Sequence, residues 1–388
     1  MDRIHSLLVR QRPFGLTISL STAKQLSWPG ITRTAIFHLN RYKGRFNAYQ
    51  RTYVISPKRG ALIDVDFLFY ALKTLTQRLG DYSQGTATKF LTINILSSLL
   101  VPTPAVPEQR TIARTLGSLD EKIELNRLTN ETLEAIARAI FKSWFVDFDP
   151  VHARAEGRQP FGMDAETAAL FPRSFNESFI GVVPTGWRAS TLGDEVTTLL
   201  GGTPARSNVR YWTSGTIPWI NSGKVNEFRI VEPSEYITED ALRGSATKIL
   251  PARTTVIAIT GATLGQVSLL EIESCANQSV VGVLGSGNVP SEYLYFWIKQ
   301  NVSSLAAWQT GGAQQHINKE NVNKLPILCP SLPAVSAYMS LVKPMFDRIK
   351  NNCFESLTLG RIRDALLPKL ISGEIRVKDA AKMIEQKV

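Results

Sequence analysis

Apolar residues between Glu108 and Phe145 recur at alternating spacings of four and three. This heptad spacing places apolar side chains along one seam of an α-helix and is typical of helices that pair with another helix. A helix of this span would be on the order of 57 Å long at about 1.5 Å per residue, so the sequence predicts a long spacer. The seam positions are Ile112, Leu116, Leu119, Ile123, Asn126, Asn130, Leu133, Ala137, Ile140 and Trp144.

The chain repeats itself at an offset of 226 residues. The segment from Phe67 aligns with the segment from Tyr293 without a gap, and eight identities fall in the 41 positions that end at Pro107 and Pro333. The apolar pattern carries more weight than the identities, because it continues for about forty residues into a second helix. The second seam is Tyr338, Val342, Met345, Ile349, Asn352, Ser356, Leu359, Arg363, Leu366 and Leu370.

Asn126 and Asn352 occupy the same position in the two seams. A polar residue buried in a seam lowers stability but fixes register and partner, so the matching asparagines are suited to helices that pair with each other. Because a globular region lies between the helices, we predict an antiparallel pair within one chain. The alternative is that each helix packs separately on its own domain.

The region between the helices changes period. Residues 150–183 are rich in Pro, Gly and acidic residues, which predicts a linker with little regular structure. From Trp187 to Pro330, short β-rich runs ("TTVIAIT", "QVSLLEI", "SVVGVL") are bounded by Gly, Ser and Asn, while "SEYLYFWIKQNVSSLAAWQ" is typical of a helix. This composition predicts an α+β domain with exposed loops.

Four loops of this domain are rich in glycine and amide side chains: "LGGTPARSN", "INSGKVN", "TGATLGQ" and "TGGAQQHIN". Glycine lets backbone approach a ligand closely, and Asn, Gln, Lys and Thr hydrogen-bond to base edges and phosphates. The alternative for each loop is an ordinary turn. Four such loops in one domain favour a nucleic-acid contact surface.

The charge balance points to a polyanionic partner. The chain has 44 Lys and Arg against 33 Asp and Glu, a net charge of +11, and a pI near 9.6. Residues 1–59 carry eleven of these basic residues against Asp2 alone, so the remainder is almost balanced. The charge is therefore concentrated near the N-terminus.

Cysteine usage and hydropathy predict a cytoplasmic protein with no membrane association. Cys275, Cys329 and Cys353 are too widely spaced for a disulfide framework or a zinc ribbon. No apolar run is long enough to span a membrane, and the N-terminus lacks the pattern of a signal peptide. An organellar transit peptide is the alternative for the acid-poor, Arg-containing N-terminus.

The order of these segments resembles the specificity subunit of type I restriction-modification enzymes. The matching motifs are "PEQRTIARTLGSLDEKIELNRLTNETLEAIARAIFKSWFVDFDPV" in the first helix, "PTGWRASTLGDE" opening the second domain, and "LLPKLISGEIRV" closing the second helix. "CANQSVVGV" and "TGGAQQHINKENVNKLPI" resemble that domain's later strands and its recognition loop. The resemblance covers about Phe46 to Val377.

The resemblance implies an α+β fold: two α/β target recognition domains, the first truncated, separated by two long antiparallel coiled-coil helices. It implies a non-catalytic subunit whose two domains each read one half of a bipartite double-stranded DNA target. The helices would set the gap between the halves and dock two methyltransferase subunits, which methylate a flipped adenine. Restriction and translocase subunits would join them. This chain would hold no cofactor, and S-adenosylmethionine, ATP and Mg would be bound by the partner subunits.

The resemblance divides the chain into six segments: 1–106, the first recognition domain, N-terminally truncated or replaced; 107–149, the first spacer helix; 150–183, the linker; 184–330, the second recognition domain; 331–377, the second spacer helix; and 378–388, a tail. We expect Asn126 and Asn352 to pair the helices, and we expect no catalytic or metal-binding residue. The candidate DNA-binding residues are Thr86, Thr88, Lys89, Gly201, Gly202, Thr203, Lys224, Thr260, Gly261, Gln266, Asn277, Gln278, Gly311, Gly312, Gln314, Gln315 and Asn318.

The start of the chain departs from the family pattern. Residues 1–106 are fewer than residues 184–330, and nothing between Met1 and Asn40 resembles "GWRASTLGDE". The Gly-rich loop "ITGATLGQV" aligns with "ITRTAIFHL" from Ile31, where no glycine remains. The basic excess of this region is either an adaptation to bind phosphates or an accident of the rearrangement.

An enzyme is not indicated, because the chain lacks methyltransferase, phosphate-loop and nuclease motifs. The "DEK" at Asp120 to Lys122 is interpreted as a solvated helix face, and "GSGN" at Gly285 to Asn288 as a strand turn. The alternative function is a coiled-coil interaction scaffold, or an inactive truncated remnant, without sequence-specific DNA binding. It would leave the amide-rich loops without a role. The histidines have no metal-ligand spacing: His5, His38, His152 and His316.

Overall fold

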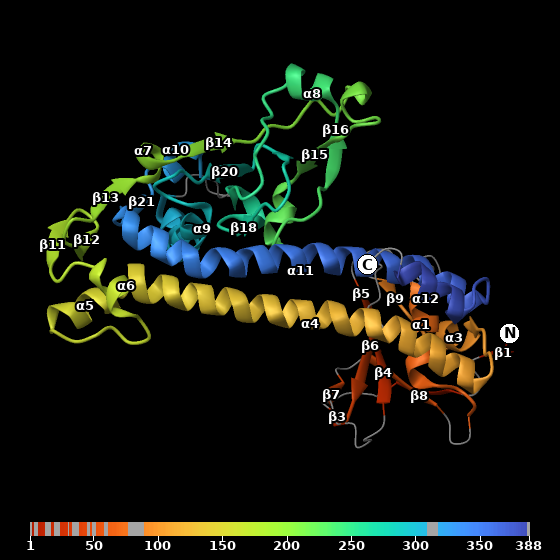
Figure 1. Cartoon of the computed structure of the whole chain (residues 1–388). Helices are drawn as coiled ribbons and strands as arrows, with labels where there is room; N and C mark the ends of the chain where they lie inside the picture. Colours follow the sequence, from red (N-terminus) through yellow and green to blue (C-terminus); the bar gives the residue numbers. More distant parts are fainter. Residues whose placement is uncertain are drawn as a thin grey trace. The chain divides into compact units, whose positions relative to one another are not determined.

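Two long helices and two sheet-bearing regions make up the chain. The computed structural model describes residues 2–3, 7–11, 17–18, 24–29, 31–32, 39–44, 47–48, 52–57, 61–76, 89–308 and 317–385. They form two compact units, Met1–Leu125 with Glu355–Val388 and Asn126–Phe354. The helices α4 (Val106–Phe145) and α11 (Leu332–Ser372), yellow and blue in Figure 1, each contribute one part to each unit.

The predicted long helices are confirmed, and they run antiparallel within each unit. In the first unit, Lys122 Nζ lies 3.3 Å from Glu355 Oε2, and Arg363 Nη1 lies 2.6 Å from Asp120 Oδ1. In the second unit, Asn126 meets Asn352. Every predicted seam position is buried or half-buried. The helices therefore pack on each other rather than separately.

The middle of the seam holds a layer of amides. The side chains of Asn126 and Asn352 are buried, and Asn126 Nδ2 donates to the backbone oxygen of Asn352 at 3.4 Å. Asn352 Nδ2 in turn donates to Asn130 Oδ1 at 2.8 Å. The amide partner of Asn352 is thus Asn130, one helical turn from the position that the repeat indicates, because the side chains of facing helices interleave.

The central sheet of the second unit is antiparallel, with the strand order β14-β20-β17-β18. The middle strands β17 and β20 are buried almost along their length, which explains their continuous apolar sequence. The three predicted β-rich runs correspond to β17, β18 and β20. The strand bounds are β14 (Thr197–Leu200), β17 (Thr255–Ala258), β18 (Val267–Leu269) and β20 (Val280–Leu284).

Helix α9 (Ser291–Asn301) joins this sheet to the long helices, and it continues as the 3-10 helix η5 (Val302–Trp308). Its aromatic side chains interlock with those of α4 and α11. The ring centroids of Phe141 and Tyr293 lie 5.4 Å apart, and those of Phe296 and Phe346 lie 5.5 Å apart. Aromatic pairs of this kind stabilise a core beyond their buried area. The predicted helix is confirmed.

A lobe with its own three-stranded sheet, order β16-β15-β19, lies between β14 and β20 in the sequence. Its elements are η2 (Val209–Tyr211), β15 (Ile217–Ile220), η3 (Ser222–Asn226), β16 (Glu235–Ile237), α8 (Glu239–Gly244) and β19 (Cys275–Ala276). The remaining elements of the unit include β13 (Arg188–Thr191) paired with β21 (Pro326–Cys329), α7 (Leu192–Glu195), η4 (Gly261–Thr263) and α10 (Lys319–Asn323).

The predicted linker has more regular structure than we expected. It contains α5 (Asp149–Ala155), α6 (Ala165–Ala169) and the hairpin of β11 (Phe175–Ser178) with β12 (Gly181–Pro184). Val151 and Phe171 are buried in the same core as Phe145 and Trp187. The prediction of little regular structure is wrong, because apolar residues spaced among the polar ones anchor this segment to the core.

The first unit contains a sheet of the order β2-β8-β4-β6 and the helices α1 and α3. Side chains of α1, including Leu68 and Tyr70, share a core with Leu116 of α4 and Leu366 of α11. The element bounds are β1 (Asp2–Arg3), β2 (Leu7–Gln11), β3 (Thr17–Ile18), β4 (Lys24–Pro29), β5 (Ile31–Thr32), β6 (Asn40–Lys43), β7 (Asn47–Ala48), β8 (Thr52–Pro57), α1 (Val65–Lys73), β9 (Lys89–Phe90), α3 (Ile93–Ser98), β10 (Leu100–Val101) and α12 (Val377–Glu385).

The central sheets of the two units and the helices beside them correspond to one another. The order β2-β8-β4-β6 corresponds to β14-β20-β17-β18, and β1 pairs with β10 as β13 pairs with β21. Helix α1 corresponds to α9, α3 to α10, and α4 to α11, each starting 226 residues earlier. The internal repeat is therefore a repeat of the fold.

The first recognition domain is shorter because of an internal difference. Only residues 12–23 lie between β2 and β4, whereas residues 201–254 lie between the corresponding strands β14 and β17. Most of the lobe of the second unit comes from this longer segment. The strands β1 and β2 take the places of β13 and β14, so the difference in length lies between β2 and β4; that the first domain is truncated or replaced at its N-terminal side stays a prediction.

Candidate nucleic-acid interface

Two of the amide-rich loops and the turn of Asn277 and Gln278 meet at one end of the central sheet of the second unit. The backbone N–H of Ile259 donates to Ser279 O at 2.9 Å, and the N–H of Ile317 donates to Ile259 O at 3.0 Å. These bonds bring together the loops that carry Asn277 and Gln278, Thr260 to Gln266, and Asn318. The described candidate residues of these loops thus lie close together in the fold.

The loop of Gly201 and Gly202 joins the same group of loops. The N–H of Gly202 donates to Ala276 O at 2.8 Å, and the Thr203 hydroxyl donates to the Gln278 side chain. A Cβ at Gly201 would lie 2.1 Å from the Asn277 carbonyl oxygen, and one at Gly202 would lie 2.6 Å from a backbone nitrogen. These glycines therefore allow the chain to approach itself, and the space beside them is filled by protein rather than by a ligand.

The loop from Thr260 to Gln266 is the open one. Gly261 and Gly265 have φ angles of +62° and +81°, and a Cβ on either would meet nothing within 4 Å. Glycine is needed there for the left-handed backbone of an exposed turn. Within the part of the chain that the structure describes, the buried Oε1 of Gln266 has no hydrogen-bond partner. This loop can therefore present backbone and side-chain groups to a ligand.

Lys224, on η3, has its charge neutralised within the protein. Its Nζ lies 2.8 Å from Glu227 Oε1 and 3.8 Å from Glu232 Oε1, and its side chain is only 17% exposed. The Asn221 side chain accepts from the N–H of Gly223 at 2.9 Å and so caps η3. Lys224 would have to leave Glu227 before it could contact a phosphate.

Two of the candidate asparagines serve the fold. Asn277 Oδ1 accepts from the N–H of Ser279 at 3.1 Å and holds a turn. Asn318 is the N-cap of α10: its Oδ1 accepts from the N–H of Asn321 at 2.9 Å, and Asn321 Oδ1 accepts from the N–H of Asn318 at 3.0 Å. This reciprocal capping box uses the amide oxygen of Asn318 that a base edge would otherwise contact.

The remaining candidates lie outside the described residues. For Lys89, the backbone is part of β9, whereas the side chain lies outside the described residues. The others are Thr86, Thr88, Gly311, Gly312, Gln314 and Gln315.

Sequence reasoning missed a cationic group on the lobe. The guanidinium of Arg206 lies 3.6 Å from the centroid of the Trp212 ring, and its Nη1 and Nη2 each lie 2.7 Å from an oxygen of Glu235. Stacking and a bidentate ion pair hold the guanidinium in one orientation. An arginine placed between a Gly-Gly pair and two tryptophans was the available signal, because Trp212 and Trp219 also pack on each other.

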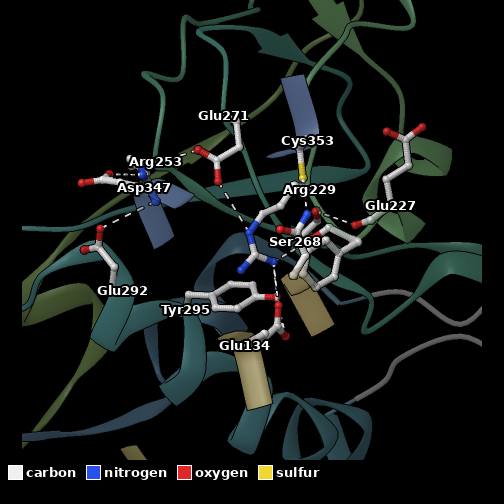
Figure 2. Close-up of polar contacts among 12 residues, drawn as sticks. Glu134, Glu227, Arg229, Arg253, Ser268, Glu271, Glu292, Tyr295, Asp347 and Cys353 are labelled. Atoms are coloured by element: carbon white, nitrogen blue, oxygen red, sulfur yellow. Dashed lines mark hydrogen bonds and ion pairs between the residues drawn. The ribbon is translucent and has the colours of Figure 1, made fainter. Parts of the chain in front are cut away.

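A buried ionic cluster attaches the second recognition domain to the helices, and sequence reasoning missed it too (Figure 2). Arg229, with no exposed side-chain surface, lies in the segment that follows η3. Its Nη1 lies 2.9 Å from Glu134 Oε2 on α4 and 2.9 Å from the Tyr295 hydroxyl on α9, and its Nε lies 3.5 Å from Glu271 Oε1. Lys299 Nζ lies 3.1 Å from the other oxygen of Glu134.

Arg253 extends this cluster to α11. Its Nη2 lies 2.6 Å from Asp347 Oδ1, its Nε 3.4 Å from Glu271 Oε2, and its Nη1 3.8 Å from Glu292 Oε1. The backbone of Arg253 has φ = +69°, a conformation that is strained for a residue with a Cβ. The contacts to three carboxylates hold the arginine in this conformation.

Burial raises the pKa values of Glu134 and Glu271, whereas the neighbouring cations lower them. Burial opposes ionisation of Glu134, but Arg229 and Lys299 outweigh it and lower the pKa of Glu134. At Glu271, burial dominates over the attraction of Arg253 and Arg229 and raises the pKa to about 7. Glu134 is therefore the anionic centre on which the cations of the cluster converge.

The "GWRASTLGDE" motif forms a second, more exposed network of an ion pair and hydrogen bonds. Arg188 Nη2 lies 2.8 Å from Glu195 Oε2, and the Ser190 hydroxyl donates to Glu195 Oε1 at 2.6 Å. The hydrogen bonds from Arg188 lower the pKa of Glu195 to about 2 against the effect of burial. The motif residues thus fasten β13 to α7 at the start of the recognition domain.

In the first unit, Asp120 has a structural role that contradicts the interpretation of "DEK" as a solvated face. Asp120 Oδ2 accepts from the Tyr70 hydroxyl at 2.6 Å, and Asp120 Oδ1 lies 2.6 Å from Arg363 Nη1. Asp120 is only 25% exposed at its side chain. It joins α1, α4 and α11 through polar contacts.

Nothing in the described ranges of the chain indicates a membrane span or a metal cluster. No described helix combines the length and the apolar character that crossing a bilayer requires. The described His, Cys, Asp and Glu side chains form no group of three or more that could hold a metal ion.

Comparison with known proteins decides the family. The "Type I restriction modification DNA specificity domain" family matches residues 15–135 and 184–351. The chain belongs to this family. The specificity-domain match begins at residue 15, earlier than the resemblance from about Phe46 indicated, and the first matched segment is shorter than the second. The candidate loops and the buried cluster described above lie mainly in the second matched segment.

Individual relatives of the specificity family agree with this result. The chain is 31% identical to the HindI specificity subunit of Haemophilus influenzae, over 83% of this chain and 80% of that protein. It is 27% identical to the MjaIX specificity subunit of Methanocaldococcus jannaschii, over 84% and 72% of the two chains. The crystal structure of the type I S subunit from M. genitalium matches with a TM-score of 0.55 at 16% identity, over 91% and 84% of the chains, and so shares the fold.

Proposed function

We propose that this chain is the DNA-recognition subunit of a type I restriction-modification complex and that it reads a bipartite target. The observation that carries the proposal is the repeat of one sheet order in two units, each built on its own part of an antiparallel helix pair. Two recognition modules in one chain can each read one half of a divided sequence. The match of both modules to the specificity family supports this function over an interaction scaffold without DNA binding.

The second recognition domain would contact bases through its loop surface. From Pro184 to Pro330 it has equal numbers of basic and acidic residues, so net charge does not favour DNA binding there. Affinity would therefore rest on local donors and acceptors, such as those of the open turn from Thr260 to Gln266 and of Gln278. The candidates Gln314 and Gln315 belong to the same proposal, because amide side chains read adenine in the major groove.

The first recognition domain would contribute mainly phosphate contacts. It has the basic excess of residues 1–59 but only a short segment where the second domain has its lobe. Phosphate contacts weaken steeply with salt and carry little sequence information. The half-site read by this domain should thus be the less specific of the two.

The partner subunits would be two methyltransferases that dock on the helices, with restriction and translocase subunits added to this core. Leu128 and Ile136, on the outer face of α4 in the second unit, are 46% and 43% exposed, which is costly for apolar side chains that remain in water. A partner helix would cover them. S-adenosylmethionine, ATP and Mg would be bound by these partners, and this chain would hold no cofactor and catalyse no step.

The test compares the purified chain with the chain mixed with a candidate type I methyltransferase subunit from the same organism. We expect no methyl transfer and no cleavage by the chain alone, and methylation of DNA by the mixture that requires both proteins. Methyl transfer by the isolated chain, or methylation by the partner without this chain, would contradict the proposal.

A further inference from the structure

We infer that Arg229 and its buried partners Glu134 and Glu271 are positioning residues that fix the spacing of the DNA target. They would do so by holding the second recognition domain at one place along the spacer helix α4. This inference rests on the proposed function. It concerns which residues make the complex discriminate between targets whose two halves are separated by different numbers of base pairs.

The cluster is connected to the central sheet through the backbone on either side of Arg229. Arg229 follows η3 in the sequence, and the Ser268 hydroxyl on β18 donates to Glu227 O at 2.7 Å within the same segment. The N–H of Ile230 donates to Leu269 O at 3.0 Å. The segment that follows the 3-10 helix η3 is thus fastened to the central sheet immediately beside the arginine that reaches Glu134 on α4 (Figure 2).

The ionic contacts add a directional constraint to the apolar packing of the domain on the helices. The apolar part of this contact includes aromatic residues such as Phe141, Tyr293 and Phe346, and apolar attraction by itself has no preferred direction. An arginine–carboxylate contact, in contrast, depends on distance and orientation. Glu134 receives Arg229 Nη1 at 2.9 Å and Lys299 Nζ at 3.1 Å on its two oxygens, so it defines one position of the domain along α4.

The spacing of DNA base pairs sets how far the domain would have to move to accept a target of another length. Neighbouring base pairs are separated by about 3.4 Å along the duplex axis. A shift of the domain by that distance along α4 would break the contacts of Glu134 with both Arg229 and Lys299. A domain that kept these contacts would therefore reject a spacer that is one base pair too long or too short.

Burying the charges of the cluster opposes folding through the loss of their hydration, so the presence of the cluster calls for a role other than stability. Arg229 and Glu271 have no exposed side-chain surface, and Glu134 has 3%. The Arg229 Nε and both oxygens of Glu271 make ionic contacts without hydrogen-bond geometry. Buried ion clusters of this kind are often no more stabilising than apolar residues of the same volume, while they do impose a defined arrangement.

The experiment uses the complex of the full chain with its methyltransferase subunits. The triple variant Glu134→Leu, Arg229→Met, Glu271→Leu replaces the cluster by apolar side chains of similar volume. The matched control, Arg188→Met with Glu195→Leu, removes an ion pair of the same domain that joins β13 to α7 rather than the domain to Glu134 of α4. Methylation rates are measured on the cognate target and on targets with one base pair added to or removed from the spacer, and thermal unfolding is measured in parallel.

We expect the triple variant to unfold at or above the temperature of the wild type and its preference for the cognate spacer to fall about tenfold, a change of ~1.4 kcal/mol. The control should keep the wild-type preference. The half-site sequences should be unchanged in both, because the base-contacting loops are intact. Unchanged spacer preference in a folded triple variant would overturn the inference.

A second variant keeps the test decisive if the triple variant does not fold. Glu134→Gln with Arg229→Gln retains polar groups of similar size but removes the charges. We expect it to lose part of the spacer preference, and a preference equal to that of the wild type would again overturn the inference. Should the wild-type complex itself methylate all spacers equally, the proposed bipartite reading would be wrong, which is a different outcome.

Discussion

The single substitution Arg229→Met tests the energetics of the buried cluster. It removes the cation that lies 2.9 Å from Glu134 and 3.5 Å from Glu271, and both carboxylates stay buried. Removing one partner of a buried ion pair costs about 3–5 kcal/mol, because the remaining buried carboxylates lose one of the cations that compensate their charge. Domains are stable by only about 5–15 kcal/mol, so a large part of the stability of this unit should be lost.

The assay is thermal unfolding followed by calorimetry or circular dichroism. For a unit of the size of Asn126–Phe354, each kcal/mol corresponds to about 2–4 °C, so the expected decrease in melting temperature is roughly 6–20 °C. Arg127→Met is the matched control, because its ion pair with Glu131 is exposed on α4, the helix that also carries Glu134. Exposed pairs contribute about 0.2–1 kcal/mol. A decrease for Arg229→Met no larger than that for Arg127→Met would refute the reasoning.

Three further predictions concern the seam, the loops and the opening motif. Asn352→Leu should lower the free energy of unfolding by about 1–3 kcal/mol in chemical denaturation, because Asn130 Oδ1 loses its donor in the seam; a more stable variant would contradict this. Replacing Gln314 and Gln315 by Ala should relax the sequence preference at one half-site by about 1–3 kcal/mol per lost bidentate contact, and an equal loss of affinity on cognate and random DNA would show that these residues only position the loop. The pKa of Glu195, lowered from 4.5 to about 2, gives the folded protein a stabilisation that is complete above about pH 4.5 and is lost as the pH falls through 2. The difference in unfolding free energy between wild type and Glu195→Gln should thus close between pH 5 and pH 2, and a constant difference would contradict it.

The two long helices and the strands β17, β18 and β20 could be predicted because their signals are local. The alternating spacing of four and three residues fixed the seam, and the exact offset of the repeat related Leu332 to Val106. The buried runs of β17 and β20 were recognisable from their apolar sequence. Such patterns depend only on neighbours within a few turns of the same element.

The buried cluster could not be predicted, because its members are far apart in the sequence. Glu134 next to the seam was a signal, since a carboxylate in an apolar environment needs a cation. Which cation it receives depends on how the segments after η3 and β18 fold back towards α4. Tertiary contacts determine this path, and the local sequence does not reveal it. Arg229 and Glu271 stand in no periodic relation to Glu134.

The loop candidates show the limit of composition as a guide to binding. Asn318 and Gly202 have side-chain and backbone roles within the fold, which residue type alone does not distinguish from ligand contacts. The spacing of Asn318 and Asn321 was a signal for a capping box that we interpreted as an amide-rich recognition loop. By contrast, the exposed turn at Gly261 and Gly265 remains suited to contact DNA.

A genome-wide map of methyladenine, in cells that express this chain with a candidate methyltransferase partner, tests the proposed reading of DNA most directly. The account predicts one bipartite motif, with a fixed spacer between a more specific half and a less specific half, and its loss when this chain is deleted. Methylation at a continuous motif, or a pattern that does not change without this chain, would contradict the account.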